Sequence, residues 1–219
     1  MVILTFSTTG LIRRICSIDR MPVKFLANHN CIVAGPTGAG KTHFLLQVID
    51  KKLIHPFPKN IFWMYAVEQD FMSRYPNITF IKGLDFSKVD TSEPSAVIFD
   101  DLMLNINKEV ASSFIMSSHH KKISIFMVVQ TLFINCDIYR LMSINCHYMV
   151  IFKNPRNFRQ LHTLARQIFV GRDVNRVLES YKRACNSKRG FIVLSFSPLL
   201  PPELTVLTDY FRTWPSIYL

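Results

Sequence analysis

Residues 35–42, with the sequence GPTGAGKT, fit the phosphate-loop pattern G-x-x-x-x-G-K-[ST]. Several donors must meet the charge of a triphosphate at once, and glycines let backbone amides point inward where a Cβ would intrude. Lys41 is then placed to reach the β- and γ-phosphates, and the Thr42 hydroxyl to ligate Mg²⁺. The pattern therefore predicts binding of a nucleoside triphosphate with Mg²⁺. The predicted nucleotide-binding residues are Gly35, Pro36, Thr37, Gly38, Ala39, Gly40, Lys41 and Thr42.

Two adjacent carboxylates, Asp100 and Asp101, follow a short apolar run at residues 96–99. Next to a phosphate loop, Asp100 would hold Mg²⁺ through water, and Asp101 would orient or deprotonate the attacking water. A pair of aspartates after a strand is also a common turn or helix cap. The phosphate loop upstream favours the catalytic interpretation.

Gln130 ends another apolar run, residues 123–130. Its amide is expected at the carboxyl edge of a sheet, where α/β proteins bind their ligands. A role in sensing the γ-phosphate or positioning water is favoured over that of a plain strand end.

These residues need a scaffold, and the chain offers short apolar runs that alternate with helical patterns. Strands that are apolar throughout belong in a sheet covered on both faces, so we predict an α/β fold with a mainly parallel sheet. The expected strands are 31–35, 61–66, 78–83, 96–101, 123–130, 148–154 and 190–196, and the expected helices include 42–53, 107–118 and 158–169.

Residues 158–169 place apolar side chains on one stripe and basic ones on another. We expect Gly171 to end this helix in a left-handed cap and Asp173 to cap the next helix. The buried stripe of that second helix is predicted to be Val174, Val177, Leu178 and Tyr181.

The composition predicts a folded chain with a basic surface for binding a partner. The 219 residues are 49% apolar and 12% aromatic and carry a net charge of +11. Residues 153–189 hold ten basic side chains against two acidic ones, a net of +8. This excess favours a polyanionic partner over a merely solvated basic face. The ten are Lys153, Arg156, Arg159, Arg166, Arg172, Arg176, Lys182, Arg183, Lys188 and Arg189.

Several classes of protein are disfavoured. The longest uncharged apolar stretch, 123–136, is too short to span a membrane, and the first residues lack the basic region of a secretory signal, so we expect an intracellular chain without a membrane partner. Five cysteines without a CxxC pair argue against a disulfide framework, and the adjacent His119 and His120 do not share a helix face for a metal. The GTPase base reader fails in NKEV at Asn107, and a small-molecule kinase would leave the aspartate pair and the basic segment unexplained.

Four blocks resemble the FtsK/HerA-type ATPases, and within them the genome-packaging ATPases of polinton-like, adintovirus-like and poxvirus-like DNA viruses. They are GPTGAGKT at 35–42, VIFDDLM at 97–103, SSHHKKISIFMVVQTLF at 117–133 and NCHYMVIFKNPRNFRQLHTLARQIFVG at 145–171. The order and separations are similar to those of the family, and the resemblance extends to about residue 196.

The resemblance implies a P-loop NTPase with a RecA-like (ASCE) core that hydrolyses ATP and pumps double-stranded viral DNA into a capsid. It also implies a homo-oligomeric ring of five or six subunits, a capsid or portal partner, and a place in the infected host cell, at a nuclear or cytoplasmic assembly site or with the virion. DNA would be gripped without reading its sequence. A helicase or translocase of the same superfamily, and a nucleotide-binding structural adaptor without turnover, stay open as alternatives.

In such rings an arginine from one subunit completes the site of its neighbour. Arg156 and Arg166, inside the last block, are the candidates, and Arg140 is a weaker one; contact with DNA or solvent alone is the alternative for each. Asp101 departs from the glutamate that many family members carry there. The chain also lacks room for the guiding or anchoring domains of cellular members, which favours the compact viral type.

We divide the chain into an N-terminal extension at 1–24, a P-loop ATPase core at 25–197 and a C-terminal tail at 198–219 that packs on the core.

Overall fold

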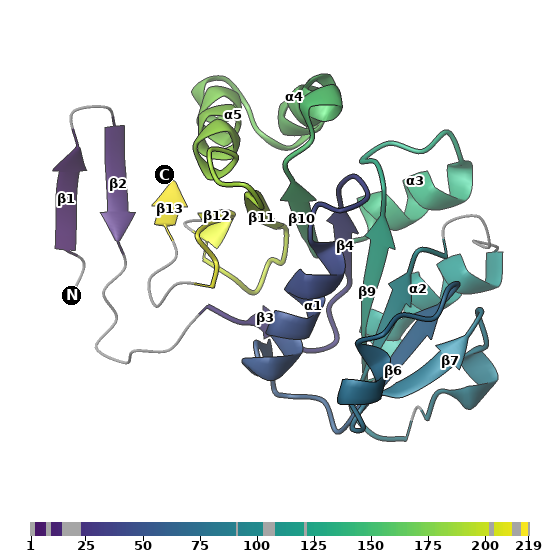
Figure 1. The fold of residues 1–219 in the computed structure, drawn as a ribbon. Helices are drawn as coiled ribbons and strands as arrows, with labels where there is room; N and C mark the ends of the chain where they lie inside the picture. Colours follow the sequence, from purple (N-terminus) through teal and green to yellow (C-terminus); the bar gives the residue numbers. More distant parts are fainter. Residues whose placement is uncertain are drawn as a thin grey trace.

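A parallel sheet forms the centre of the molecule (Figure 1). The computed structural model describes residues 3–7, 10–14, 23–90, 92–102, 108–120, 122–201, 204–211 and 216–218. Neighbouring strands in this part of the sheet run parallel, in the order β10-β4-β9-β8-β6-β7. The strands are β4 (Cys31–Ala34), β6 (Asn60–Tyr65), β7 (Thr79–Lys82), β8 (Ser95–Asp100), β9 (Ile123–Val129) and β10 (Tyr148–Phe152).

Antiparallel strands extend the sheet beyond β10, in the order β11-β12-β13-β2-β1. Their bounds are β11 (Phe191–Ser195), β12 (Val206–Thr208), β13 (Ser216–Tyr218), β2 (Gly10–Arg14) and β1 (Ile3–Ser7). A separate pair, β3 (Phe25–Leu26) and β5 (Ile54–His55), is parallel. The predicted mainly parallel α/β fold is confirmed for the core, and the division into extension, core and tail stays a prediction.

Helices cover both faces of the sheet (Figure 1). One face packs against α1 (Lys41–Asp50). The other packs against α2 (Lys108–His120), α3 (Asp137–Ile144), α4 (Phe158–Ile168) and α5 (Arg172–Ala184). Within β4, Cys31 and Val33 join the α1 side, whereas Ile32 and Ala34 join the other. This two-sided burial explains why the strands are apolar at every position.

The first helix is shorter than the predicted 42–53. It ends at Asp50, where the backbone amide of Lys51 donates to the carbonyl of Gln47 and that of Lys52 donates to the carbonyl of Ile49. Lys52 then takes a positive φ of 51° and turns the chain away. Leu53 is buried outside the helix, just before β5. Its apolar character therefore reflects core packing and not a continuing helical stripe.

The capping predictions at the α4–α5 turn are wrong, although the buried stripes are confirmed. Gly171 has φ 62° and ψ −123°, which is not the left-handed helical conformation, and it precedes α5 instead of ending α4. Asp173 lies inside the first turn of α5 and forms an ion pair with Arg176 at 3.1 Å. The turn starts earlier because α4 ends at Ile168. The buried apolar residues of the two helices are Leu161, Leu164, Ala165, Val174, Val177, Leu178 and Tyr181.

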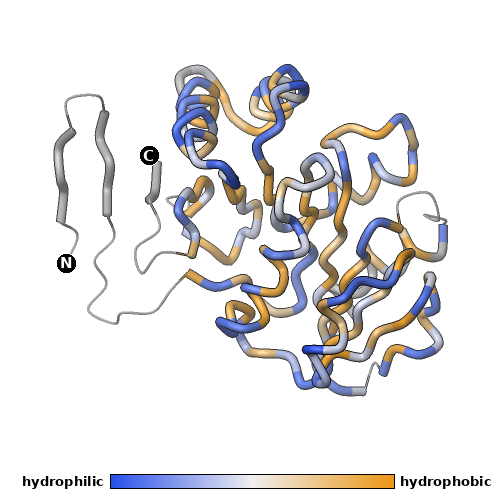
Figure 2. The backbone as a smooth tube through the Cα atoms, viewed as in Figure 1, coloured by the Kyte–Doolittle hydropathy of each residue, from blue (hydrophilic) through white to orange (hydrophobic). Residues whose placement is uncertain are grey.

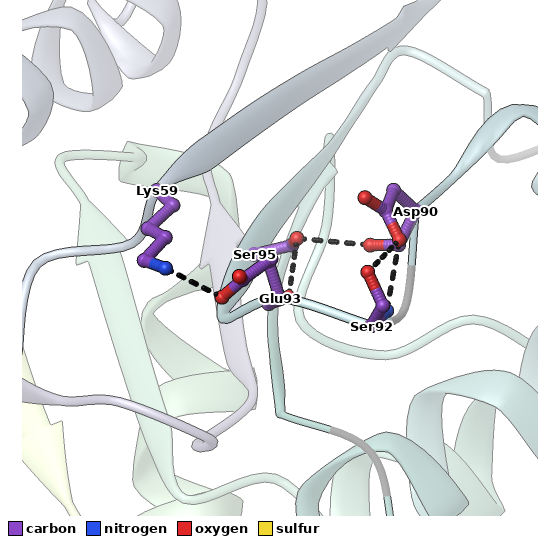
Figure 3. Close-up of polar contacts among 5 residues, drawn as sticks. All are labelled: Lys59, Asp90, Ser92, Glu93 and Ser95. Atoms are coloured by element: carbon purple, nitrogen blue, oxygen red, sulfur yellow. Dashed lines mark hydrogen bonds and ion pairs between the residues drawn. The ribbon is translucent and has the colours of Figure 1, made fainter.

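Polar contacts fix the turn that leads into β8 (Figure 3). The buried Ser95 hydroxyl donates to the carbonyl oxygens of Asp90 at 3.0 Å and Glu93 at 2.8 Å. The backbone amide and hydroxyl of Ser92 donate to Oδ1 of Asp90 at 2.9 and 2.6 Å. Lys59 forms an exposed ion pair with Glu93 at 2.8 Å. These contacts anchor the first residue of the strand that carries Asp100.

Three short 3-10 helices complete the described elements: η1 (Met72–Arg74), η2 (Phe86–Lys88) and η4 (Pro155–Asn157). Cys31 and Cys146 are buried, Cys136 and Cys185 are partly buried, and all four are free thiols. Within the described ranges, no helix has both the length and the apolar character needed to cross a bilayer. Cys16, Asn107 and the side chains of His119 and His120 lie outside the described part of the chain.

Candidate nucleotide-binding site

The phosphate loop connects β4 to α1 at the carboxyl edge of the sheet. Gly40 caps the helix in a left-handed conformation, with φ 101° and ψ 21°. Gly38 also has a positive φ, 77°, and a Cβ added there would meet nothing within 4 Å. The helix therefore begins at Lys41, directly after a loop with two glycines at positive φ. A helix N-terminus of this kind favours an anion.

The base of the loop is closely packed. A Cβ on Gly35 would lie 2.6 Å from Cβ of Phe152, the last residue of β10. Glycine is therefore needed at the position where the loop contacts the end of that strand. The Gly35 amide donates to the carbonyl of Val129 at 3.1 Å. The Ala39 amide donates to the carbonyl of Pro36 at 3.1 Å, within the loop itself. These contacts hold the loop in shape before any ligand binds.

The ammonium of Lys41 lies within the loop. Its Nζ donates to the carbonyl oxygens of Gly35 at 2.6 Å and Pro36 at 3.0 Å. Burial lowers the pKa of Lys41, and the carboxylates of Asp100 and Asp101 partly oppose that shift. A phosphate oxygen would be a stronger, charged acceptor than these neutral carbonyls.

Asp100 ends β8 and is only 4% exposed. Oδ2 accepts a contact from the Thr42 hydroxyl at 3.5 Å and a hydrogen bond from Nε2 of Gln69 at 3.3 Å. Burial raises the pKa of Asp100, and the Gln69 hydrogen bond partly opposes the rise. A hydroxyl and a carboxylate facing each other fit Mg²⁺, which prefers oxygen ligands. Thr42 and Asp100 are therefore the residues that would hold the metal.

Asp101 and Gln130 follow the ends of the adjacent strands β8 and β9. Asp101 adopts a positive φ of 56°, so its backbone leaves the extended conformation of the strand. Nε2 of Gln130 donates to Oδ1 of Asp101 at 3.1 Å, and both side chains are exposed. The two residues are thus placed together, 29 positions apart in the chain.

One cleft of about 390 Å³ brings these side chains together. That volume is in the range of nucleotide-sized ligand sites. The residues that line it are Thr37, Gly38, Gly40, Lys41, Thr42, His43, Gln69, Asp100, Asp101, Val128, Gln130 and Arg189. Donors for phosphate, oxygen ligands for a metal and a carboxylate next to an amide therefore share one solvent-accessible space.

The candidate arginines do not line this cleft. Arg156 lies in η4 and Arg166 in the last turn of α4, and both side chains are exposed. Arg166 instead borders a second hollow, of about 500 Å³, with His162 and Val170. Arg140, in α3, is exposed as well and is not among the residues that line the cleft. A catalytic role for any of them requires the cleft of another molecule.

Four residues that line the cleft were not predicted from the sequence: His43, Gln69, Val128 and Arg189. Gln69 lies in the connection after β6 and hydrogen-bonds Asp100, yet it belongs to no motif. Arg189 precedes β11, and its Cδ lies 3.4 Å from the position of a Cβ on Gly40. Its only sequence signal was membership of the basic segment, which it shares with nine other residues.

The basic segment occupies the surface of α4, α5 and the loops at their ends. Figure 2 shows hydrophilic residues interspersed with hydrophobic ones along both helices. Ion pairs with Asp173 and Glu179 engage Arg176 at 3.1 Å and Lys182 at 3.0 Å. The exposed basic side chains are Lys153, Arg156, Arg159, Arg166, Arg176, Lys182, Lys188 and Arg189.

No protein-family model and no curated protein matches the sequence, but solved structures match the fold. The genome packaging NTPase B204 from Sulfolobus turreted icosahedral virus 2, in complex with AMPPCP, aligns with a TM-score of 0.51 at 9% identity, over 77% of this chain and 92% of that one. The DNA-packaging ATPase B204 from Sulfolobus Turreted Icosahedral Virus gives 0.50 at 10% identity, over 77% and 93%. The chain has the P-loop NTPase fold.

In this fold, β9 separates the strand of the phosphate loop from the strand of the aspartate pair. Gln130 directly follows this intervening strand and lines the cleft together with Lys41 and Asp101. The B204 structure in complex with ATP-gammaS gives the same fold likeness, with a TM-score of 0.50 at 10% identity over 77% of this chain and 92% of that one.

Proposed function

We propose that the chain is an ATPase subunit of a motor that translocates double-stranded viral DNA into a capsid. The observation that carries the proposal is the convergence of Lys41, Asp100, Asp101 and Gln130 on one cleft. B204, which has the same fold, is a genome-packaging NTPase, and this likeness supports the choice of DNA packaging over other uses of ATP.

The cleft provides a group for each part of the hydrolysis. The loop amides and Lys41 would bind the β- and γ-phosphates, and Thr42 with Asp100 would hold Mg²⁺, which would neutralise phosphate charge. Asp101 takes a proton from water as the water oxygen bonds to the γ-phosphorus and the bond from that phosphorus to ADP breaks. Gln130 holds the carboxylate of Asp101 in place through its hydrogen bond.

Sequence-independent DNA contact would come from the basic surface of α4 and α5. Lysines and arginines that meet phosphates suffice for a motor that does not read sequence. Lys153 and Arg159 are exposed, and the ion pairs among the described residues do not engage them. Binding through such contacts weakens steeply as salt rises.

Assembly into a ring of five or six copies is part of the proposal. Arg156 and Arg166 are exposed and away from the cleft, as a residue that serves a neighbouring subunit must be. Leu141 and Ile144, one turn apart in α3, are 51% and 72% exposed and offer apolar area for contact between copies. The ring would act with a capsid or portal protein at an assembly site in the infected cell.

The test is ATP turnover by the purified protein with Mg²⁺, with and without long double-stranded DNA, at low and moderate salt. Lys41→Ala is the blank. We expect DNA to stimulate turnover, and the stimulation to fall as salt rises. Turnover that DNA does not change at any salt concentration would contradict a DNA motor. Bound ATP without turnover would favour a structural adaptor, and DNA unwinding independent of a capsid would favour a helicase.

A further inference from the structure

Arg189 lies at the edge of the cleft, in the loop between α5 and β11. Its Cδ, Cγ and Nε lie 3.4, 3.8 and 3.9 Å from the position of a Cβ on Gly40. The side chain is exposed and lines the cleft together with Lys41 and Thr42. None of the ion pairs among the described residues includes it. The side chain of Arg189 thus lies beside Gly40, the residue that caps the start of α1, and forms no ion pair with a carboxylate among the described residues.

The loop that carries Arg189 is closely tied to the core. A Cβ on Gly190 would lie 2.0 Å from the carbonyl oxygen of Ala184, so this position requires glycine. The Gly190 amide donates to the carbonyl of Ser187 at 3.3 Å, and the Lys153 amide donates to the carbonyl of Gly190 at 2.8 Å. The backbone next to Arg189 is therefore fixed against both the end of α5 and the end of β10.

The cleft has two flanks, and Arg189 lies on the flank without carboxylates. In the sheet order, β10 and β11 lie on one side of β4, whereas β9 and β8 lie on the other. Asp101 and Gln130 come from β8 and β9, and Arg189 comes from β11. If a nucleotide binds along the phosphate loop with its γ-phosphate near Asp101, its α-phosphate and nucleoside lie toward Arg189.

We propose that Arg189 binds the nucleotide of its own subunit at the α-phosphate and nucleoside end. This inference rests on the proposed function, which sets the direction of the nucleotide. A guanidinium offers paired hydrogen bonds to phosphate and a flat face for a base. The contact is made in the same chain, so it differs from an arginine that acts on a neighbouring subunit.

A contact at the α-phosphate end has a specific thermodynamic signature. ATP and ADP share that end, so loss of Arg189 must weaken both nucleotides by the same factor. A contact with the γ-phosphate would weaken ATP alone. Arg189 is therefore expected to set affinity, whereas Asp101 and Gln130 set turnover.

The experiment is calorimetric titration, in the presence of Mg²⁺, of ADP and separately of ATPγS. The proteins compared are the wild type, Arg189→Ala, Arg189→Lys and Lys188→Ala. Lys188 is the matched control, because it is the exposed neighbour with the same charge and does not line the cleft. We expect Arg189→Ala to weaken both nucleotides about tenfold, the usual scale for one charge-assisted contact. Arg189→Lys should recover part of the loss, since charge persists without the planar fork, and Lys188→Ala should bind within about twofold of wild type.

Other patterns of affinity overturn the assignment of Arg189. Weaker ATPγS with unchanged ADP would place Arg189 at the γ-phosphate, and unchanged affinity for both would remove it from the nucleotide. An equal loss in Lys188→Ala would reduce the effect to general surface charge. A wild type that binds both nucleotides but shows no ATP turnover in the separate rate assay would end the proposed function, while the ratio of affinities between variant and wild type still decides the role of Arg189. A wild type that binds neither nucleotide would end both.

Discussion

The side-chain amide of Gln130 donates a hydrogen bond to Oδ1 of Asp101 over 3.1 Å. The two residues come directly after neighbouring parallel strands, β9 and β8, so the sheet itself sets their separation. Asp101 reaches Gln130 from a backbone with φ 56°, a conformation that aspartate and asparagine adopt more readily than most residues. Substitutions in this pair can therefore show which of the two side chains positions or deprotonates the attacking water.

Asp101→Asn should abolish most turnover without harming the fold. Asparagine tolerates the positive φ and keeps an oxygen that accepts from Gln130, so only the proton-accepting carboxylate is lost. We expect turnover to fall at least about a hundredfold with ADP affinity unchanged, the usual scale for a general base. Steady-state ATPase rates and ADP titration measure the two quantities. Full activity in this variant would exclude Asp101 as the base.

Gln130→Ala should reduce turnover about tenfold, because an unoriented carboxylate is a poorer base. If Gln130 acts through Asp101, the double variant with Asp101→Asn should be no slower than Asp101→Asn alone. The double-mutant cycle in turnover measures this coupling. Losses that multiply would instead show that Gln130 contacts the γ-phosphate or water independently of Asp101.

Asp100→Asn should stabilise the ligand-free protein at neutral pH while it abolishes the response to Mg²⁺. Burial raises the pKa of Asp100, so the folded state disfavours the ionised form. A carboxyl group of this kind contributes stability below its unfolded pKa and loses that contribution as pH rises through its folded pKa. The uncharged asparagine removes this loss, and we expect a gain of about 1 kcal/mol in the free energy of unfolding near pH 7.

The gain from Asp100→Asn should vanish as pH falls to about 4 and below, where the wild-type carboxyl is protonated as well. Urea unfolding of both proteins across pH measures it. Added Mg²⁺ with ADP should reverse the order at neutral pH, because ligand binding stabilises only a protein that holds the metal. A variant less stable than wild type at neutral pH without ligand would contradict a desolvated carboxylate at this position.

The core strands and the phosphate loop could be predicted because their signals are local. A strand buried on both faces is apolar at each position, as Cys31 and Ile32 are, and the loop has a fixed spacing of glycines and lysine. The placement of three polar residues near the loop was also predictable, because the carboxyl ends of parallel strands meet at one edge of the sheet. These residues are Asp100, Asp101 and Gln130.

The rest of the site depends on chain paths that no local pattern encodes. Gln69 reaches Asp100 across 31 positions, from a connection whose course the packing of β6 and η1 decides. Arg189 has the same charge as its neighbours, and only the tight packing at Gly190 brings it to the cleft. The prediction that Gly171 caps the end of α4 was wrong for a related reason. A glycine between two helices can end one or precede the other, and tertiary packing decides which.

Arg166→Ala tests the expected contribution of one subunit to the site of another. Arg166 is exposed at the end of α4 and does not line the cleft of its own chain. If it completes a neighbour's site, subunits of the variant should inactivate wild-type partners in a mixed ring, and turnover should fall more steeply than the wild-type fraction. Arg159→Ala changes an exposed arginine of the same helix two turns earlier, on the surface that we propose contacts DNA, and it is the control: turnover measured without DNA should stay a linear function of its fraction in the mixture. Turnover strictly proportional to the wild-type fraction for both variants would assign Arg166 to DNA or to solvent.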